Sequence, residues 1–151
     1  MVGGITILYE CSKGRGCFKL SPKISKELVN HRLEQAKEDL IASKALYDLK
    51  LYKSSNNRAY YSIFHSIKAV FALEPVDFKR HKDVIAYFNK NYVHAEIFPK
   101  SMGRRIADAS KIREDSDYDD EFVVKPEDTF AQIQTAEELI KLVEEYIKGK
   151  E

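Results

Sequence analysis

The stretch NRAYYSIFHSIKAVFA, residues 57–72, decides which fold this chain adopts. It holds no glycine or proline, and its hydrophobic side chains recur at spacings of three and four residues: Tyr60, Ile63, Ile67, Val70 and Phe71. At about 100° per residue these side chains share one face of an α-helix. The stretch therefore predicts a helix that packs one face on a hydrophobic core.

The opposite face of this helix holds Arg58, Tyr61, His65 and Lys68. Arg58 and His65 are seven positions apart. Two helical turns separate them, so their side chains extend in nearly the same direction about 10 Å apart. Exposed helix faces usually carry Glu, Lys and Gln, whereas this one adds small residues that permit close helix packing: Ser62, Ala69 and Ala72. We therefore expect the helix to be covered on both sides, by its own bundle and by a partner chain.

The rest of the chain divides into further helices at prolines, which mark helix starts and stops. Predicted helices span residues 21–49, 54–74, 82–92 and 99–114, and a last one begins at Pro126. The start of the second is placed at the capping-type residues Ser54 to Asn57. Inward-facing side chains are expected in the last three helices at Val84, Ile85, Phe88, Met102, Ile106, Ala109, Ile112, Phe130, Ile133, Ile140, Val143 and Ile147. The pattern predicts an all-α fold of about five helices.

Length and composition indicate a single globular domain. The chain has 151 residues, and its 25 Lys and Arg nearly balance 24 Asp and Glu, so any nucleic-acid contact is expected to be a local patch. Residues 1–20 are predicted to be a short irregular extension, a tail or a small hairpin, before a domain at 21–151. Cys11 and Cys17 in that extension lack metal-site spacing and neighbouring His, so we expect plain thiols, no metal and no cofactor. Without a long apolar run, the expected location is the cytoplasm, away from membranes.

The segment from Arg58 to His65 resembles the signature of the HEPN domain family, an arginine followed after four to six residues by a histidine on one helix. The similarity covers about residues 30–148 and includes Arg32-Leu33 with Ala36, Asp77 to His81, and Tyr118 to Asp120. It implies an antiparallel up-and-down helical bundle that forms a homodimer in which the two motif helices face each other. It also implies a toxin-like role in a toxin–antitoxin module, paired with a minimal nucleotidyltransferase.

The resemblance further implies a chemistry, because many HEPN proteins are metal-independent endoribonucleases. In that chemistry His65 acts as general base or acid at the ribose 2′-hydroxyl, and Arg58 holds the scissile phosphate. Tyr61 is expected either to contact the RNA or to line the dimer seam. Lys68 and His81 are further candidate RNA-binding residues, although a basic cluster at a helix start, such as Lys79–Lys82, is usually only solvated.

One position departs from the family pattern and keeps other functions open. Catalytic members often carry Asn or Asp directly after the motif arginine, where this chain has Ala59. The alternative is therefore a non-catalytic module that binds nucleotide or docks a nucleotidyltransferase through Arg58 and His65. A third interpretation is a scaffold dimer whose motif only orders the interface.

Two charged segments outside the motif are also candidates. Basic residues make the fourth helix a possible track for a phosphate backbone: Lys100, Arg104, Arg105, Lys111 and Arg113. The acidic run at residues 114–121 lacks the ligand spacing and central glycine of a calcium loop, so it predicts a solvated linker or a partner for basic residues.

Overall fold

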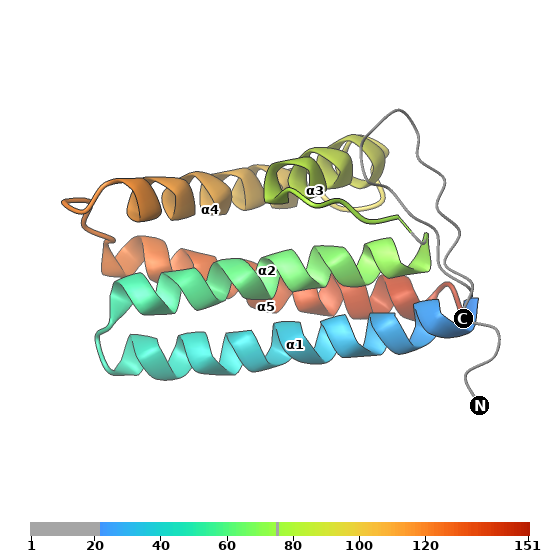
Figure 1. Cartoon of the computed structure of the whole chain (residues 1–151), viewed down its shortest axis with the longest axis horizontal. Helices are drawn as coiled ribbons and strands as arrows, with labels where there is room; N and C mark the ends of the chain where they lie inside the picture. The colour runs from blue at the N-terminus through green and yellow to red at the C-terminus, as the bar shows by residue number, and fades with distance from the viewer. Residues whose placement is uncertain (1–21, 75) are drawn as a thin grey trace.

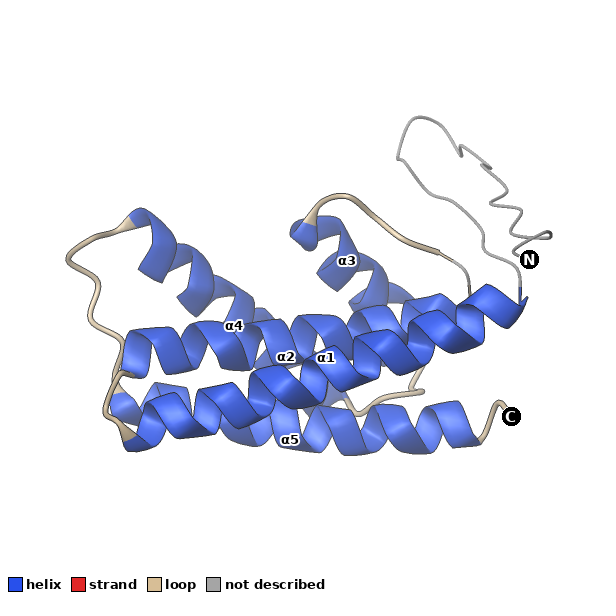
Figure 2. Ribbon diagram, turned by 60° about the horizontal axis from the view of Figure 1, so that its bottom comes forward, coloured by secondary structure: helices blue, strands red, loops and turns tan. Residues whose placement is uncertain are grey.

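The computed structural model of the chain describes the backbone of residues 22–74 and 76–151, with side chains from residue 26 onward. These residues form an all-α bundle, and no strand occurs among them (Figures 1 and 2). The helices are α1 (Pro22–Asp48), α2 (Tyr52–Leu73), α3 (His81–Phe88), the π-helix η1 (Asn89–Val93), α4 (Lys100–Tyr118) and α5 (Pro126–Lys148). The predicted all-α fold is confirmed, whereas the extension at residues 1–20 lies outside the described part of the chain.

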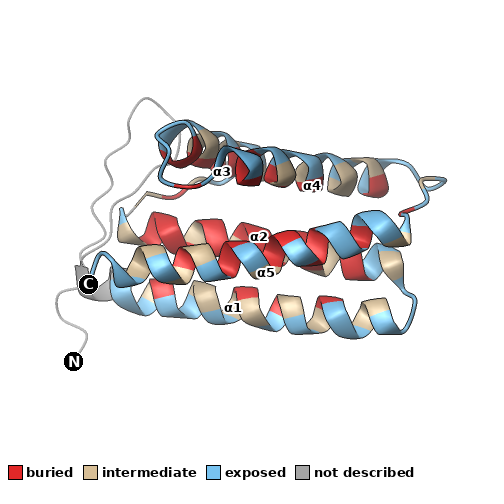
Figure 3. Ribbon diagram, turned by 180° about the vertical axis from the view of Figure 1, so that it is seen from behind, coloured by how far each residue is buried: buried red, intermediate tan, exposed pale blue. Residues whose placement is uncertain are grey.

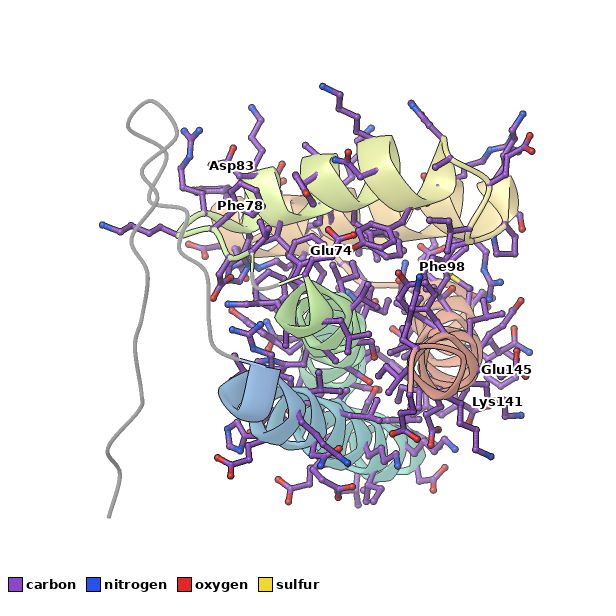
Figure 4. All side chains as sticks on the ribbon, turned by 90° about the vertical axis from the view of Figure 1, so that its right-hand side faces the viewer. Glu74, Phe78, Asp83, Phe98, Lys141 and Glu145 are labelled. Carbon is purple, nitrogen blue, oxygen red and sulfur yellow. The ribbon has the colours of Figure 1, made fainter. Side chains whose placement is uncertain are left out.

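The central element of the bundle is α2. It contacts α1, α3, α4 and α5. In Figure 1, α1, α2, α4 and α5 alternate in direction. The end-on view of Figure 4 shows α2 between α1 and the layer of α3, with α5 beside it, and α3 crossing the bundle at a steep angle. A helix covered on this many sides must be largely apolar or small, which is the composition predicted for it.

The predicted core stripe of α2 is buried. Its five side chains are each no more than 2% exposed: Tyr60, Ile63, Ile67, Val70 and Phe71. They pack in one cluster with Val84, Phe88, Met102, Ile106, Leu139 and Val143 from the neighbouring helices. Figure 3 shows the buried residues concentrated along α2 and on the inward sides of the other helices. The prediction that Phe130 points inward is wrong. This side chain is 49% exposed at the start of α5 and contacts the Tyr47 ring.

The small residues of α2 pack inside its own chain, not against a partner. Ser62, Ala69 and Ala72 are all buried, and the Ser62 hydroxyl donates to the Ala36 carbonyl of α1 over 2.7 Å. One helix turn before the motif, the hydroxyls of Ser43 and Ser55 donate to each other's backbone carbonyls, both over 2.7 Å. The expectation that these small residues await a second chain was therefore wrong, because all three are covered by their own chain, and Ser62 meets α1 directly.

Several helix ends differ from prediction. α2 begins at Tyr52 after Leu51, and none of the side chains described here caps that end, so Ser54 to Asn57 lie within the helix. α4 continues to Tyr118, so residues 114–118 of the acidic run are helical and not a linker. The third predicted helix ends as the π-helix η1, where α4 approaches so closely that a Cβ on Gly103 would lie 2.8 Å from Val93 Cγ1. Tertiary packing fixed these ends, and local capping signals did not.

Candidate active site

Arg58 and His65 of α2 meet at a buried carboxylate of α1, Asp39. Arg58 Nη1 donates to Asp39 Oδ1 over 3.0 Å, and His65 Nε2 lies 3.6 Å from Asp39 Oδ2. The Asp39 side chain is 6% exposed, whereas those of Arg58 and His65 are 38% and 28% exposed. A ligand in solvent can therefore reach the arginine and the histidine, while the carboxylate orients them from below.

Asp39 is held in an environment that does not fully satisfy it. Burial raises the pKa of Asp39, against the lowering effect of the Arg58 charge. Its Oδ2 atom is buried and accepts no hydrogen bond from any residue that the structure describes. This oxygen lies 3.6 Å from the His65 Nε2 atom, so a small approach of the two side chains completes a hydrogen bond.

His65 is uncharged at neutral pH. Burial lowers the pKa of His65 to about 4, and the positive charges of Lys68, Arg32, Arg58 and His81 lower it in the same direction. The contact with Asp39 is therefore not an ion pair at pH 7, because the neutral imidazole carries no charge, although it keeps one N–H group. A neutral imidazole among cations can accept a proton from a ligand whose anionic groups those cations attract.

Aromatic rings form the wall beside these residues. The Arg58 guanidinium carbon lies 4.9 Å from the centre of the Tyr61 ring, and the Tyr61 and His65 ring centres are 6.2 Å apart. His81, the first residue of α3, stacks on Phe64 at 4.0 Å and lies 5.8 Å from Tyr61. Burial, followed by the charges of Arg113 and Lys68, lowers the pKa of His81. The structure thus brings four of the predicted site residues together: Arg58, Tyr61, His65 and His81.

His81 does not belong to a solvated basic cluster. The Tyr60 hydroxyl lies 3.3 Å from His81 Nδ1, within hydrogen-bond reach. By contrast its neighbour Arg80 is exposed and pairs with Asp83 within the first turn of α3, at 2.8 Å. The return of the chain after α2 places the first residue of α3 over the motif, which residue spacing along the sequence does not show.

Lys68 belongs to a second charged cluster on the same side of α2. Its Nζ atom is 2.9 Å from Asp77 Oδ1, and Arg32 Nη2 donates to Asp77 Oδ2 over 2.9 Å. Arg32 also donates to the Lys68 carbonyl over 2.7 Å. This cluster ties α1, α2 and the segment before α3 together, so Lys68 is engaged with protein groups in this structure.

Comparison with known proteins gives the same family that the motif suggested. Residues 29–146 match the HEPN domain. This chain belongs to the HEPN domain family. A protein of Methanocaldococcus jannaschii that carries the name "Putative toxin" is 36% identical over 93 residues, covering 62% of this chain and 69% of that protein. A second protein of that organism with the same name is 29% identical over 96 residues, or 64% and 65% of the two chains. A "UPF0332 protein" of Thermotoga maritima is 25% identical over 122 residues, or 81% and 92%.

In this HEPN protein, Ala59 cannot supply the polar group that often follows the motif arginine. Ala59 is 0% exposed and lies within the bundle, so a polar side chain there would be buried away from Arg58. Asp39 contacts the arginine and the histidine instead, from a different helix. Sequence reasoning missed Asp39, although its position three residues after Ala36 and four before Ser43 puts a carboxylate on the inward face of α1.

Arg113 of α4 also lies beside the motif residues, at a place that could not be predicted. Its guanidinium carbon lies 5.2 Å from the Tyr60 ring centre and 5.8 Å from that of Tyr61. The predicted basic track along α4 is not continuous, because Arg105 donates to Thr135 and to Glu138 of α5.

None of the described helices combines the length and the apolar composition needed to cross a bilayer.

Proposed function

We propose that this protein is a metal-independent endoribonuclease and the toxin-like half of a module with a minimal nucleotidyltransferase. The observation that carries the proposal is the contact of one buried carboxylate, Asp39, with both motif residues. Support also comes from membership of the HEPN domain family and from two relatives that carry the name "Putative toxin".

The geometry supports a transesterification of RNA. Neutral His65 takes the proton of a ribose 2′-hydroxyl, and the 2′-oxygen attacks the adjacent phosphorus. The bond from phosphorus to the 5′-oxygen breaks, that oxygen receives a proton, and a 2′,3′-cyclic phosphate remains on the other fragment. Arg58 holds the non-bridging oxygens and offsets the charge that develops on them.

The leaving 5′-oxygen receives the proton that His65 took from the 2′-hydroxyl, because an imidazole with a pKa of about 4 carries no extra proton at neutral pH before that step. In the proposed homodimer the two motif helices face each other across one cleft, so His65 of either subunit can carry this proton. The partial exposure of Arg58 and His65 is compatible with that arrangement, since their tips extend beyond the surface of their own bundle. The nucleotidyltransferase would act as the antitoxin of the pair.

The proposal is tested by incubating end-labelled RNA with the purified protein in EDTA. We expect cleavage by the parent chain, and its loss in His65→Ala and in Arg58→Ala. The matched controls are His94→Ala and Arg104→Ala, which change exposed residues of the same types. All variants are first checked for helicity by circular dichroism and for mass by light scattering. Absence of cleavage on every RNA tested, with folded dimeric protein, rejects the nuclease proposal.

The second candidate is a nucleotide-binding or nucleotidyltransferase-docking module without catalysis, which the apolar Ala59 favours. The same experiment separates the two when RNA retention on a filter is measured beside cleavage. Retention that depends on Arg58 and His65, with intact RNA recovered, supports the binding module. A light-scattering mass of one chain contradicts the composite cleft in both versions.

A further inference from the structure

A cavity of about 490 Å³ opens beside Arg58, outside the contact with Asp39. It lies among the end of α1, the first two turns of α2 and the last turns of α4. These ends of α2 and α4 are on the same side of the molecule in Figure 1. The volume falls in the range of pockets that hold small molecules. Because Arg58 lines the cavity, a ligand in it would adjoin the motif.

The charge of the cavity favours an anionic ligand. Lys53, Arg58 and Arg113 contribute to its lining, and so does one acidic side chain, Asp117. Arg113 Nε lies 3.3 Å from Asp117 Oδ2, and Arg58 pairs with Asp39, so the charges of both guanidinium groups are partly offset. Lys53 is exposed at the rim, where it can meet a phosphate from solvent. Two phosphate-binding residue types therefore lie at one cavity.

Asn56 gives the cavity a specific polar group at its base. Asn56 lines the cavity and is only 2% exposed, and its side-chain oxygen has no hydrogen-bond partner among the described residues. Buried polar atoms in native structures are nearly always hydrogen-bonded, so an acceptor left open calls for an explanation. Asn56 lies inside α2 and does not cap it, so helix formation does not explain the open oxygen. A ligand in the cavity that donates an N–H group provides a partner for this oxygen once the Asn56 side chain turns toward it.

We propose that this cavity binds one nucleotide of the RNA next to the scissile phosphate, with the exocyclic amino group of its base donating to Asn56 Oδ1. The inference rests on the proposed function, and it adds a substrate preference to it. The phosphate of this nucleotide lies toward Arg58 and Lys53. Cytosine carries an amino group at position 4, where uracil carries a carbonyl oxygen that repels the Asn56 acceptor. The cavity thus distinguishes cytidine from uridine at one position of the substrate.

The test is a titration of the full-length protein with cytidine monophosphate and uridine monophosphate, in EDTA, by calorimetry and by amide NMR. We expect cytidine monophosphate to bind about tenfold more tightly, the effect of about one hydrogen bond. Asn56→Ala should abolish this preference, and Asn56→Asp, which keeps acceptor oxygens, should retain it. Asn89→Ala is the matched control, because it also removes a buried amide oxygen without a hydrogen-bond partner among described residues, at a different cavity.

The outcomes separate this inference from the proposed function. Cleavage of RNA with equal rates at cytidine and uridine sites, unchanged in Asn56→Ala, overturns the cavity assignment and leaves the nuclease intact. Preference for cytidine monophosphate that depends on Asn56, without cleavage of any RNA, supports the nucleotide site and rejects the nuclease. Equal affinities for the two nucleotides, or no binding of either at millimolar concentration, overturns the inference.

Discussion

Two buried carboxylates, Asp39 and Asp77, pair with charged residues of this bundle. Their oxygen atoms find hydrogen-bond partners to different degrees. Asp77 accepts hydrogen bonds from Arg32 and from the Phe78 backbone N–H, and it pairs with Lys68 at 2.9 Å. Asp39 accepts a bond from Arg58, and a hydrogen bond with Gln35 also acts to lower its pKa, but its Oδ2 atom has no hydrogen-bond partner within the described residues. Both side chains are at most 12% exposed.

The difference assigns the two clusters to different tasks. A buried carboxylate with both oxygens paired to cations stabilises the geometry of its neighbours and has no capacity left for a ligand. A buried carboxylate with one open oxygen 3.6 Å from an imidazole can still form a hydrogen bond when that ring changes position or proton state. We therefore take the Asp77 cluster as structural and the Asp39 cluster as functional, and four variants test that distinction.

The largest expected effect is on stability, in Asp77→Ala. Arg32 and Lys68 have side chains only 11% and 18% exposed, and the variant leaves both without their counter-ion. We expect the free energy of unfolding to fall by about 3 kcal/mol, measured by urea denaturation with circular dichroism. Asp83→Ala, at the exposed pair with Arg80, should change it much less, because solvent screens that pair. Equal losses in the two variants would contradict a structural role for Asp77.

Asp39→Asn should affect cleavage more than stability. The amide keeps the size of the side chain but removes the charge that holds Arg58 and favours an Nε2–H tautomer of His65. We expect the single-turnover rate to fall on the order of 10- to 100-fold, as for other misplaced catalytic groups. The ¹⁵N shifts of the His65 ring should change as well, which a merely structural role does not require. Asp77→Asn is the control, and a matching fall in its cleavage rate sinks the distinction.

Ala59→Asn restores the residue type that often follows the motif arginine in the family. Because Ala59 is 0% exposed, the amide would be buried, and we expect the protein to lose about 2 kcal/mol of unfolding free energy. Cleavage should not increase, because Asp39 already contacts both motif residues. Ala107→Asn, at an exposed position of α4, provides the comparison. Faster cleavage at unchanged stability would show that Asp39 does not replace the missing group.

The smallest expected effect is the change of kcat/KM for RNA with pH. Since burial and neighbouring cations lower the pKa of His65 to about 4, kcat/KM for RNA should stay level as the pH falls from 7 to about 5 and drop below that. In the unfolded chain histidine titrates near ~6.5. The unfolded state therefore binds the proton first, and the stability linked to His65 is complete above that pH and declines as the pH falls toward the folded pKa.

Arg58→Gln sharpens this test. It removes one of the cations that lower the pKa of His65 and uncovers the Asp39 charge, so the pKa of His65 should rise. NMR titration of the His65 ring protons measures the change directly, and Arg104→Gln at an exposed position is the control. A pKa of His65 near ~6.5 in the parent protein would contradict the burial of the ring.

The helices of this protein could be predicted because they depend on local spacing. The stripe of Tyr60, Ile63 and Ile67 is buried as its periodicity indicated, and α5 begins at Pro126 as expected. Helix ends were less predictable. The capping-type residues Ser54 and Asn57 lie inside α2, because contacts with α1 extend the helix beyond the point where a local cap would end it.

Sequence alone determined the helical class, the motif face with Arg58, Tyr61 and His65, and the family that this motif indicates. Only the tertiary structure decided that Asp39 joins the motif residues, that His81 stacks beside them, and that Asn56 lines a cavity next to Arg58. The physical reason is the distance along the chain over which each feature is determined. A helical period is repeated every few residues and is visible in any short window of sequence. A contact between α1, α2 and α3 depends on how whole helices pack, which no single segment encodes.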